Sequence, residues 1–244
     1  MTNQNVPWRS GQHMYPASIQ PVGQHPFRDR AASGLGGTGR IADDLHLLGH
    51  DDRTGRPSLG ARPLGIGLAS ALLAELILGD SISLQRDGVI VAHRRWPADD
   101  LGRRIRDQVA AEGEPHPVRD WLLFFARSAA EDVARRLEQA GYLRHARSLL
   151  PGRPGRWVPV DADWAYAPII RVRSALDPTR PVDPYRAVLA GLAGACGLGF
   201  RIAQSQTQGD RSVEEATGQL APGLRHLIAQ TQAAVDSAVL SHRT

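Results

Sequence analysis

Residues 64–79 read LGIGLASALLAELILG and are apolar on nearly every side, with Glu75 as the one charged side chain. A helix that is hydrophobic all round is buried, either inside a protein or in a membrane. The uncharged run 63–74 is shorter than the roughly 20 residues that a membrane span needs. The stretch therefore predicts a buried helix at the centre of a globular protein, ended by Gly79.

The composition of the 244-residue chain restricts its class. Apolar residues make up 42% of the chain, which suffices for a core and excludes a disordered protein. Cys196 is the single cysteine, so neither a disulfide framework nor a cysteine-rich zinc site is available. All 29 basic residues are arginine, against 25 acidic residues. We therefore expect a soluble protein of a reducing compartment with an arginine-rich surface.

The rest of the chain indicates further helices and two hairpins. Residues 1–40 carry four prolines and no periodic apolar pattern, which predicts disorder, and residues 1–20 lack the apolar run of a secretory signal. Short hairpins are predicted at 81–93 and 142–160. Helices are predicted at 41–48, 98–111, 118–140, 162–177, 184–204 and 212–242, with a break at Pro222. We therefore predict a mostly α, single-domain helical bundle over residues 41–244, with two β-hairpins, one of them projecting.

The sequence contains no evident catalytic machinery. It has no H-E-x-x-H zinc motif, no P-loop and no G-x-S-x-G elbow. Residues 34–39 match G-x-G-x-x-G, but no strand precedes them and Leu59 stands where the acidic residue belongs. His46 and His50 share a helix face, yet two ligands without a third are weak evidence for a metal. Glu75 indicates a structural carboxylate paired with an arginine. We therefore expect neither enzyme activity nor a cofactor.

The segment 117–160 carries the strongest functional pattern, a helical stretch followed by an arginine-rich hairpin. The guanidinium fork donates two parallel hydrogen bonds, which suits it to phosphate groups. Such a hairpin fits a membrane surface, where apolar side chains enter the headgroup zone. It also fits a DNA backbone, as in a winged helix, or no ligand at all. The candidate contact residues are Arg144, Arg147, Leu149, Leu150, Arg153, Arg156 and Trp157.

Several short stretches occur in an order that resembles a known family. They are 42–49 (ADDLHLLG), 52–55 (DRTG), 67–79 (GLASALLAELILG), 117–121 (PVRDW) and 137–143 (LEQAGYL). From about Ile41 onward the chain is similar to the Golgi phosphoprotein 3 family, and its lysine-free composition fits relatives from bacteria with GC-rich genomes. The resemblance implies a helical fold with a projecting hairpin. It also implies a peripheral protein of the cytoplasmic membrane face that binds phosphatidylinositol 4-phosphate.

The resemblance also implies particular ligands for the headgroup. In the family a tryptophan and three arginines form the pocket, and these positions correspond here to Gly60, Ala69, Arg127 and Ala130. Arg127 is the retained arginine. We expect Arg62 and Arg56, close to the position of the tryptophan, to complement it. The family further implies self-association through the 142–160 hairpin and binding of short protein tails.

We therefore predict a peripheral membrane protein that binds anionic phospholipid headgroups, by resemblance phosphatidylinositol 4-phosphate. The alternative is a winged-helix-like DNA-binding protein, in which the hairpin at 142–160 is the wing. A helix-turn-helix needs a short helix and a turn of three or four residues before its recognition helix. The pattern over 118–140 indicates one continuous helix, with a break near Ser128 as the alternative, so binding to nucleic acid is not favoured.

Overall fold

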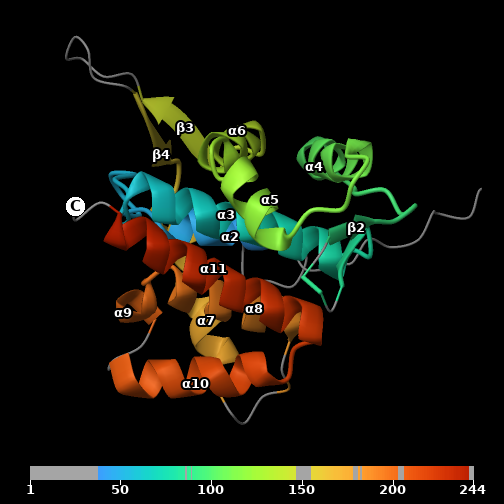
Figure 1. The fold of residues 1–244 in the computed structure, drawn as a ribbon. Coiled ribbons are helices and arrows are strands. Elements are labelled where there is room, and N and C mark those ends of the chain that lie inside the picture. Colours follow the sequence, from blue (N-terminus) through green and yellow to red (C-terminus); the bar gives the residue numbers. More distant parts are fainter. Residues whose placement is uncertain are drawn as a thin grey trace, which may run out of the picture.

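A computed structural model describes residues 38–85, 87–88, 90–146, 155–177, 181, 183–202 and 206–241. These residues form ten helices and two two-stranded antiparallel sheets (Figure 1). This arrangement confirms the mostly α fold with two hairpins. The disorder expected for residues 1–40 concerns positions that, apart from 38–40, lie outside the described residues.

Helix α3 (Ala61–Leu78) occupies the centre of the molecule, as its apolar sequence predicts. It is long and apolar enough to span a membrane by length and composition, but 78% of it is buried inside the protein. Helix α2 (Ile41–Leu48) is buried along its whole length and packs against α3. In Figure 1, α11 (Pro222–Leu240) crosses below α3, and the two helices are in contact. The core therefore forms around α3.

The first hairpin and α4 cover one end of α3. Strand β1 (Ile82–Leu84) pairs antiparallel with β2 (Ile90–Ala92). Helix α4 (Asp100–Ala111) follows, and the Asp99 carboxylate caps it by accepting a hydrogen bond from the Gly102 amide at 3.0 Å. The loop after α4 is held to the hairpin, because the Ile90 amide donates to the His116 carbonyl at 3.3 Å.

The helix predicted over 118–140 is divided near Ser128, the break that the sequence left open as the alternative to one continuous helix. The structure has α5 (Val118–Phe125) and α6 (Ala129–Gln139), separated by a three-residue turn. The apolar positions keep a helical period across this turn, so periodicity does not reveal it. At the turn, Gly65 of α3 lies so close to the Ala126 carbonyl that a Cβ there would collide with it. The break therefore coincides with a close contact between helices.

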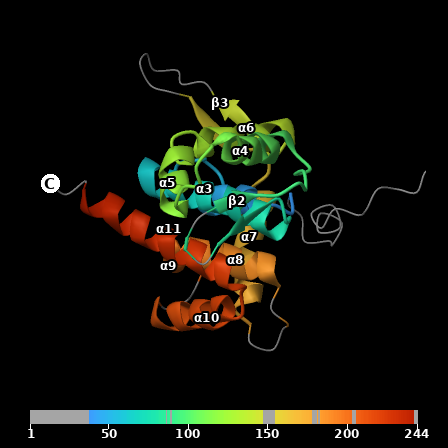
Figure 2. The ribbon, with the colours of Figure 1, turned by 45° about the vertical axis from the view of Figure 1, so that its right-hand side comes forward.

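The C-terminal part, from residue 162 onward, also contains more helices than the sequence indicates. Helix α7 (Ala162–Ala175) agrees with its prediction. The helix expected at 184–204 is two helices, α8 (Pro184–Ala195) and α9 (Gly199–Ile202). Helix α10 (Gln206–Gly218) precedes α11, which begins at Pro222 as predicted. Figure 2 shows α10 beneath α8, and these two helices are in contact.

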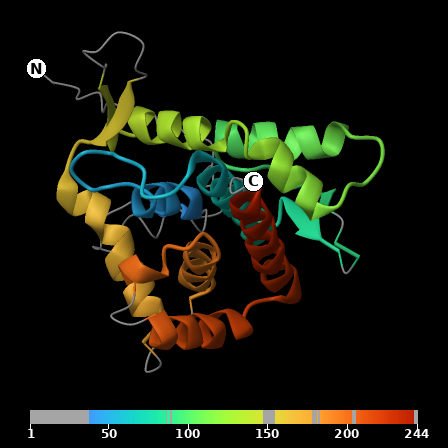
Figure 3. The same ribbon diagram turned by 60° about the vertical axis from the view of Figure 1, so that its left-hand side comes forward.

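The second hairpin extends from the body of the molecule. Strands β3 (Leu143–Ala146) and β4 (Arg156–Pro159) pair antiparallel, with Arg144 opposite Val158. Figure 3 shows the hairpin at one edge, next to the loop between α2 and α3. The residues that join its strands, 147–154, lie outside the described part of the chain.

Buried charges connect the helices. Arg136 of α6 contacts Asp43 of α2 at 2.7 Å, Glu75 of α3 at 3.3 Å and the capping residue Asp99 at 3.4 Å. Glu75 also accepts a hydrogen bond from the Ala42 amide at 2.8 Å. The expected pairing of Glu75 with an arginine is therefore confirmed. Burial raises the pKa of Glu75, and the neighbouring Arg136 opposes that rise.

A second buried pair binds the other side of α2. Arg171 of α7 donates to both Asp44 carboxylate oxygens, at 2.6 and 2.7 Å, and the Tyr185 hydroxyl donates to the same carboxylate at 2.9 Å. Burial raises the pKa of Asp44, and Arg171 opposes this effect. The adjacent acids Asp43 and Asp44 thus attach α2 to helices on two different sides.

Replacing Arg136 by alanine is expected to lower the free energy of unfolding by roughly 3–5 kcal/mol, because carboxylates would remain buried without a partner. Chemical denaturation measures this change. The matched control is Arg135→Ala, since Arg135 is exposed and, within the described residues, its ion pair is with Glu131 on the same helix. That control should cost about 0.5 kcal/mol. Equal costs for the two variants would contradict a stabilising role for the buried ion pairs.

Candidate membrane-binding surface

The loop between α2 and α3 presents Arg56 next to the projecting hairpin. The Asp51 carboxylate shapes the turn by accepting hydrogen bonds from the Thr54 amide and hydroxyl, both at 2.7 Å. Gly55 has a φ of +64° and packs so tightly on the Trp157 carbonyl that a Cβ would collide with it. The exposed Arg56 therefore belongs to the same surface as strand β4.

Arg62 lies in the first turn of α3, where its side chain is exposed. Its Nη1 donates to the Ser241 hydroxyl at 3.4 Å, so Arg62 sits beside the C-terminal end of α11. The contact of Gly65 with Ala126 makes the start of α3 a neighbour of the turn that carries Arg127. Arg62 and Arg127 are therefore on adjoining segments.

Arg127 follows α5 and lines a cavity of about 310 Å³. The other lining residues are Glu112, His116, Asp120, Trp121, Leu123 and Phe124. Neither Arg56 nor Arg62 lines this cavity. The three arginines therefore do not converge on a single pocket. The acidic residues that share the cavity with Arg127 are Glu112 and Asp120.

The three small residues that the resemblance places at the family's pocket positions differ in their surroundings. Gly60 is the exposed N-cap of α3, and a Cβ there would meet nothing closer than Pro63 Cδ at 3.5 Å. Ala69 is fully buried in the core. Ala130 is partly buried against the core. Position 69 therefore faces the interior in this chain and presents no side chain to a ligand.

The hairpin presents part of its predicted contact set. Arg144 and Arg156 are exposed. Trp157 is half-buried, where its Nε1 donates to Glu131 Oε2 at 3.4 Å and its ring lies 4.8 Å from the His145 ring. The remaining candidates, Arg147, Leu149, Leu150 and Arg153, lie outside the described residues.

Two exposed apolar residues near the base of the hairpin were missed in the sequence analysis. Val160 is 55% exposed and Trp164 is 44% exposed. The Val160 amide donates to the Tyr142 carbonyl at 3.0 Å, and the Trp164 ring lies 5.3 Å from the Tyr142 ring. The signal was present, because Val160 directly follows the second hairpin strand and Trp164 lies in the first turn of the next helix, α7. The basic hairpin therefore adjoins an exposed apolar surface.

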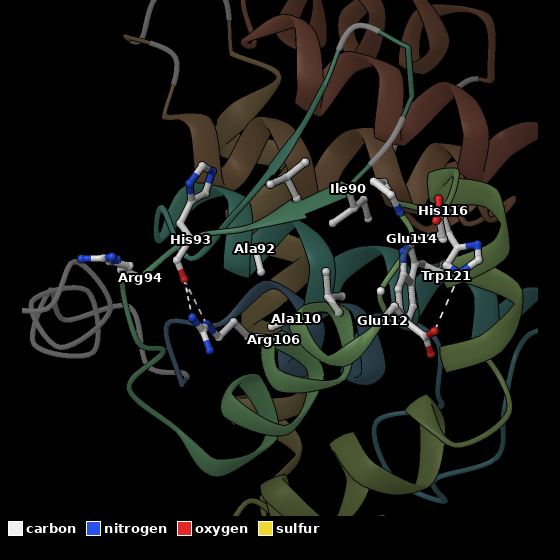
Figure 4. A pocket seen from close by; sticks show the side chains of 14 residues that line it. Ile90, Ala92, His93, Arg94, Arg106, Ala110, Glu112, Glu114, His116 and Trp121 are labelled. Atoms are coloured by element: carbon white, nitrogen blue, oxygen red, sulfur yellow. Dashed lines mark hydrogen bonds and ion pairs between the residues drawn. The ribbon is translucent and has the colours of Figure 1, made fainter.

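A larger cavity of about 450 Å³ lies between β2, α4 and the loop before α5 (Figure 4). Its Arg106 is engaged, because Nε and Nη2 donate to the His93 carbonyl at 3.1 and 2.6 Å and Nη1 pairs with Asp107. The Trp96 ring lies 4.3 Å from this guanidinium. In Figure 4 the Arg94 side chain points away from the cavity. This cavity therefore offers no free guanidinium in its interior.

A pair of histidines supports the start of the Arg56 loop. The rings of His46 and His50 stack with centroids 4.1 Å apart, and His50 Nδ1 lies 2.6 Å from the His46 carbonyl oxygen. Burial lowers the pKa of His46 well below its ordinary value, and burial also lowers the pKa of His50. No group of three or more potential ligands for a metal ion occurs in the described residues. These histidines therefore act as buried neutral groups.

The fold and surface define a class, helical proteins that carry a basic hairpin beside exposed apolar side chains. The family model described as Golgi phosphoprotein 3 (GPP34) matches residues 41–238, most of the chain. The chain therefore belongs to the Golgi phosphoprotein 3 family, which is known for binding phosphatidylinositol 4-phosphate at Golgi membranes. A search of curated protein sequences returned no match.

Replacing Gly55 by alanine should detach the Arg56 loop from the hairpin, because the new Cβ collides with the Trp157 carbonyl. The matched control is Gly141→Ala, since Gly141 has a φ of +82° but open space around its Cβ position. The control should cost about 1 kcal/mol of unfolding free energy for the left-handed backbone alone. Gly55→Ala should cost at least about 1 kcal/mol more, as measured by chemical denaturation. Similar costs would mean that this contact is easily relieved.

The buried histidines predict a stability that depends on pH. Their lowered pKa values mean that the unfolded chain binds protons that the folded chain does not, so stability is lost as the pH falls below about 6.5. Asp44 and Glu75 act with the opposite sign, because their pKa values are raised in the fold. The contribution of His46 is therefore isolated by comparing how the unfolding free energies of the wild type and of His46→Leu change with pH.

Between pH 6.5 and 5.5, the variant His46→Leu should lose about 1 kcal/mol less unfolding free energy than the wild type. This figure corresponds to about 0.7 proton on average, because the unfolded histidine is already half protonated at pH 6.5. Chemical denaturation at several pH values measures the two slopes. Identical slopes would show that His46 binds its proton equally in both states.

Proposed function

We propose that this protein is a peripheral membrane protein that binds anionic phospholipid headgroups at the cytoplasmic face of a membrane. The observation that carries the proposal is the surface formed by the hairpin and the Arg56 loop. Exposed Arg56, Arg144 and Arg156 adjoin exposed apolar Val160 and Trp164. Guanidinium groups bind lipid phosphates, and apolar and aromatic side chains enter the headgroup zone beside them.

The strength expected from such a surface is moderate and cumulative. A basic residue near an anionic membrane contributes about 1 kcal/mol, and the effect fades within a Debye length. Three exposed arginines in this part of the chain would therefore give weak binding by themselves. Buried apolar area from the hairpin would add to it.

The finer part of the proposal concerns the lipid and the partners. Membership of the Golgi phosphoprotein 3 family supports phosphatidylinositol 4-phosphate as a ligand. Arg127 is the arginine retained from the family's pocket, and Arg62 adjoins it through the start of α3. Self-association through the 142–160 hairpin and binding of protein tails belong to the same proposal, and both rest on the family resemblance.

One observation favours the second candidate, a winged-helix-like DNA-binding protein. The three-residue turn between α5 and α6, followed by the β3–β4 hairpin, has the order of helix, turn, helix and wing. The charge of α6 argues against it. Its exposed residues include Glu131 and Glu138, and Arg135 is paired with Glu131. Carboxylates on a recognition helix would repel the phosphate backbone.

Co-sedimentation with vesicles tests the membrane proposal. The double variant Arg144→Gln/Arg156→Gln should bind vesicles containing phosphatidylglycerol roughly 30-fold more weakly than the wild type. This factor corresponds to the loss of about 2 kcal/mol from two arginines. The binding of the wild type should weaken as salt is added.

The control is Arg104→Gln/Arg225→Gln, which removes the same charge from α4 and α11. It should bind within about twofold of the wild type. A parallel series with phosphatidylinositol 4-phosphate in the vesicles, compared with Arg127→Gln, tests the finer proposal. Absence of vesicle binding together with a tight shift of duplex DNA in a mobility assay would favour the second candidate instead.

A further inference from the structure

The cavity beside Arg127 joins charges of both signs to aromatic rings. Asp120 and Arg127 both line it, and their side chains make no ion pair or hydrogen bond with the described part of the chain. Glu112 adds a second carboxylate, which contacts the His116 ring at 3.8 Å. At about 310 Å³ the cavity lies within the size range of small-ligand sites.

The opposite charges are held apart on one side of a helix. Asp120, Phe124 and Arg127 are spaced four and three residues apart, so they follow one another along the surface of α5 and the turn after it. Asp120 lies in α5 and Arg127 lies in the turn after it, with Phe124 between them in the sequence. The two side chains form no ion pair with each other in the described part of the chain, so both charges remain available to a ligand.

The aromatic wall of this cavity is preformed. The Trp121 ring stacks on Phe125 at 5.4 Å and meets the edge of Phe124 at 6.0 Å. Figure 4 shows Trp121 beside Glu112 and His116, which contact each other. Trp121 is 5% exposed, and its indole N–H has no hydrogen-bond partner among the described residues. Phe124 is 46% exposed, so the rim stays accessible. The Trp121 ring is therefore packed inside the wall, whereas the Phe124 ring is accessible to a ligand.

These charges select among ligand classes. A phosphate monoester carries close to two negative charges and would meet two carboxylates against one guanidinium. A simple cation would leave the donors of Arg127 without a partner. A ligand with a phosphodiester and an ammonium group matches both, because a cation is also attracted to aromatic faces. The two charges of such a ligand must be joined by a short chain.

We propose that this cavity binds the headgroup of a zwitterionic phospholipid, with Arg127 on the phosphodiester and Asp120, Glu112 and the aromatic wall around the ammonium group. The inference rests on the proposed membrane association, and it assigns Arg127 to a phosphodiester in place of the 4-phosphate monoester of the finer proposal. It differs in its chemistry, because contact with an anionic surface requires net positive charge and this cavity does not supply it.

Soluble headgroups test the site directly. In ¹⁵N-edited NMR titrations of the full chain, glycerophosphoethanolamine or glycerophosphocholine should shift the amide signals of Phe124 and Arg127. Inorganic phosphate alone and ethylammonium alone should shift them at least tenfold less at equal concentration. Equal shifts with phosphate alone would mean a simple anion site. Equal shifts with ethylammonium alone would mean a site for cations such as basic side chains, and either result overturns the proposal.

Charge-neutral variants identify the residues. Asp120→Asn and Arg127→Gln should each weaken the binding of the soluble headgroup about tenfold, as expected when one charge-assisted contact is lost. The matched controls are Glu138→Gln and Arg135→Gln on the exposed side of α6. These controls should change the affinity by less than twofold. Equal effects of the site and control variants would overturn the assignment.

Vesicles separate this inference from the proposed function. Wild-type protein should bind phosphatidylethanolamine–phosphatidylcholine vesicles at 0.5 M salt, where surface attraction is screened, and Asp120→Asn should weaken this binding about tenfold. Binding to anionic vesicles alone, unaffected by Asp120→Asn, would overturn the inference and leave the proposed function standing. Headgroup-specific NMR shifts without any vesicle binding would support the site and contradict the proposed function.

Discussion

The contact of Arg136 with three carboxylates is the interaction on which the arrangement of the fold depends. Asp43, Glu75 and Asp99 come from α2, α3 and the start of α4, and a single guanidinium on α6 joins them. Transfer of these charges from water is costly, and the cost is offset only while all the partners are in place. Because the hairpin follows α6 directly, the same contact also sets where the basic surface lies relative to the core.

Helix α2 carries two adjacent carboxylates that pair with arginines on two sides of the helix. Asp43 pairs with Arg136, whereas the next residue, Asp44, pairs with Arg171 and accepts a bond from Tyr185. Successive residues of a helix point about 100° apart, so two adjacent acids can reach partners on different helices. The α2 helix is thereby anchored to α6 and to α7, and the loop that follows it packs on the hairpin at Gly55. The position of Arg56 depends on this anchoring.

The arginines that anchor the fold and those on its surface form two groups whose charges interact differently with their surroundings. Arg136 and Arg171 are largely removed from solvent, where each charge interacts strongly with fixed carboxylates. Arg56, Arg144 and Arg156 are exposed, where solvent and salt screen them and only their sum matters. Arg127 belongs to neither group, because it is exposed but shares a cavity with carboxylates and aromatic rings. Membership of the Golgi phosphoprotein 3 family is compatible with all three roles, since the fold does not determine the ligand.

The sequence by itself determined the buried central helix, both hairpins and the class of the fold, because these follow from local patterns of apolar residues and turn residues. It also indicated that Glu75 is paired, since a carboxylate in an apolar helix requires a partner. Only the tertiary structure decided that 118–140 is two helices, because the apolar period continues unchanged through the turn. It alone decided that Arg56 joins the hairpin while Arg127 faces carboxylates, because these neighbours are distant in the sequence and meet only through packing.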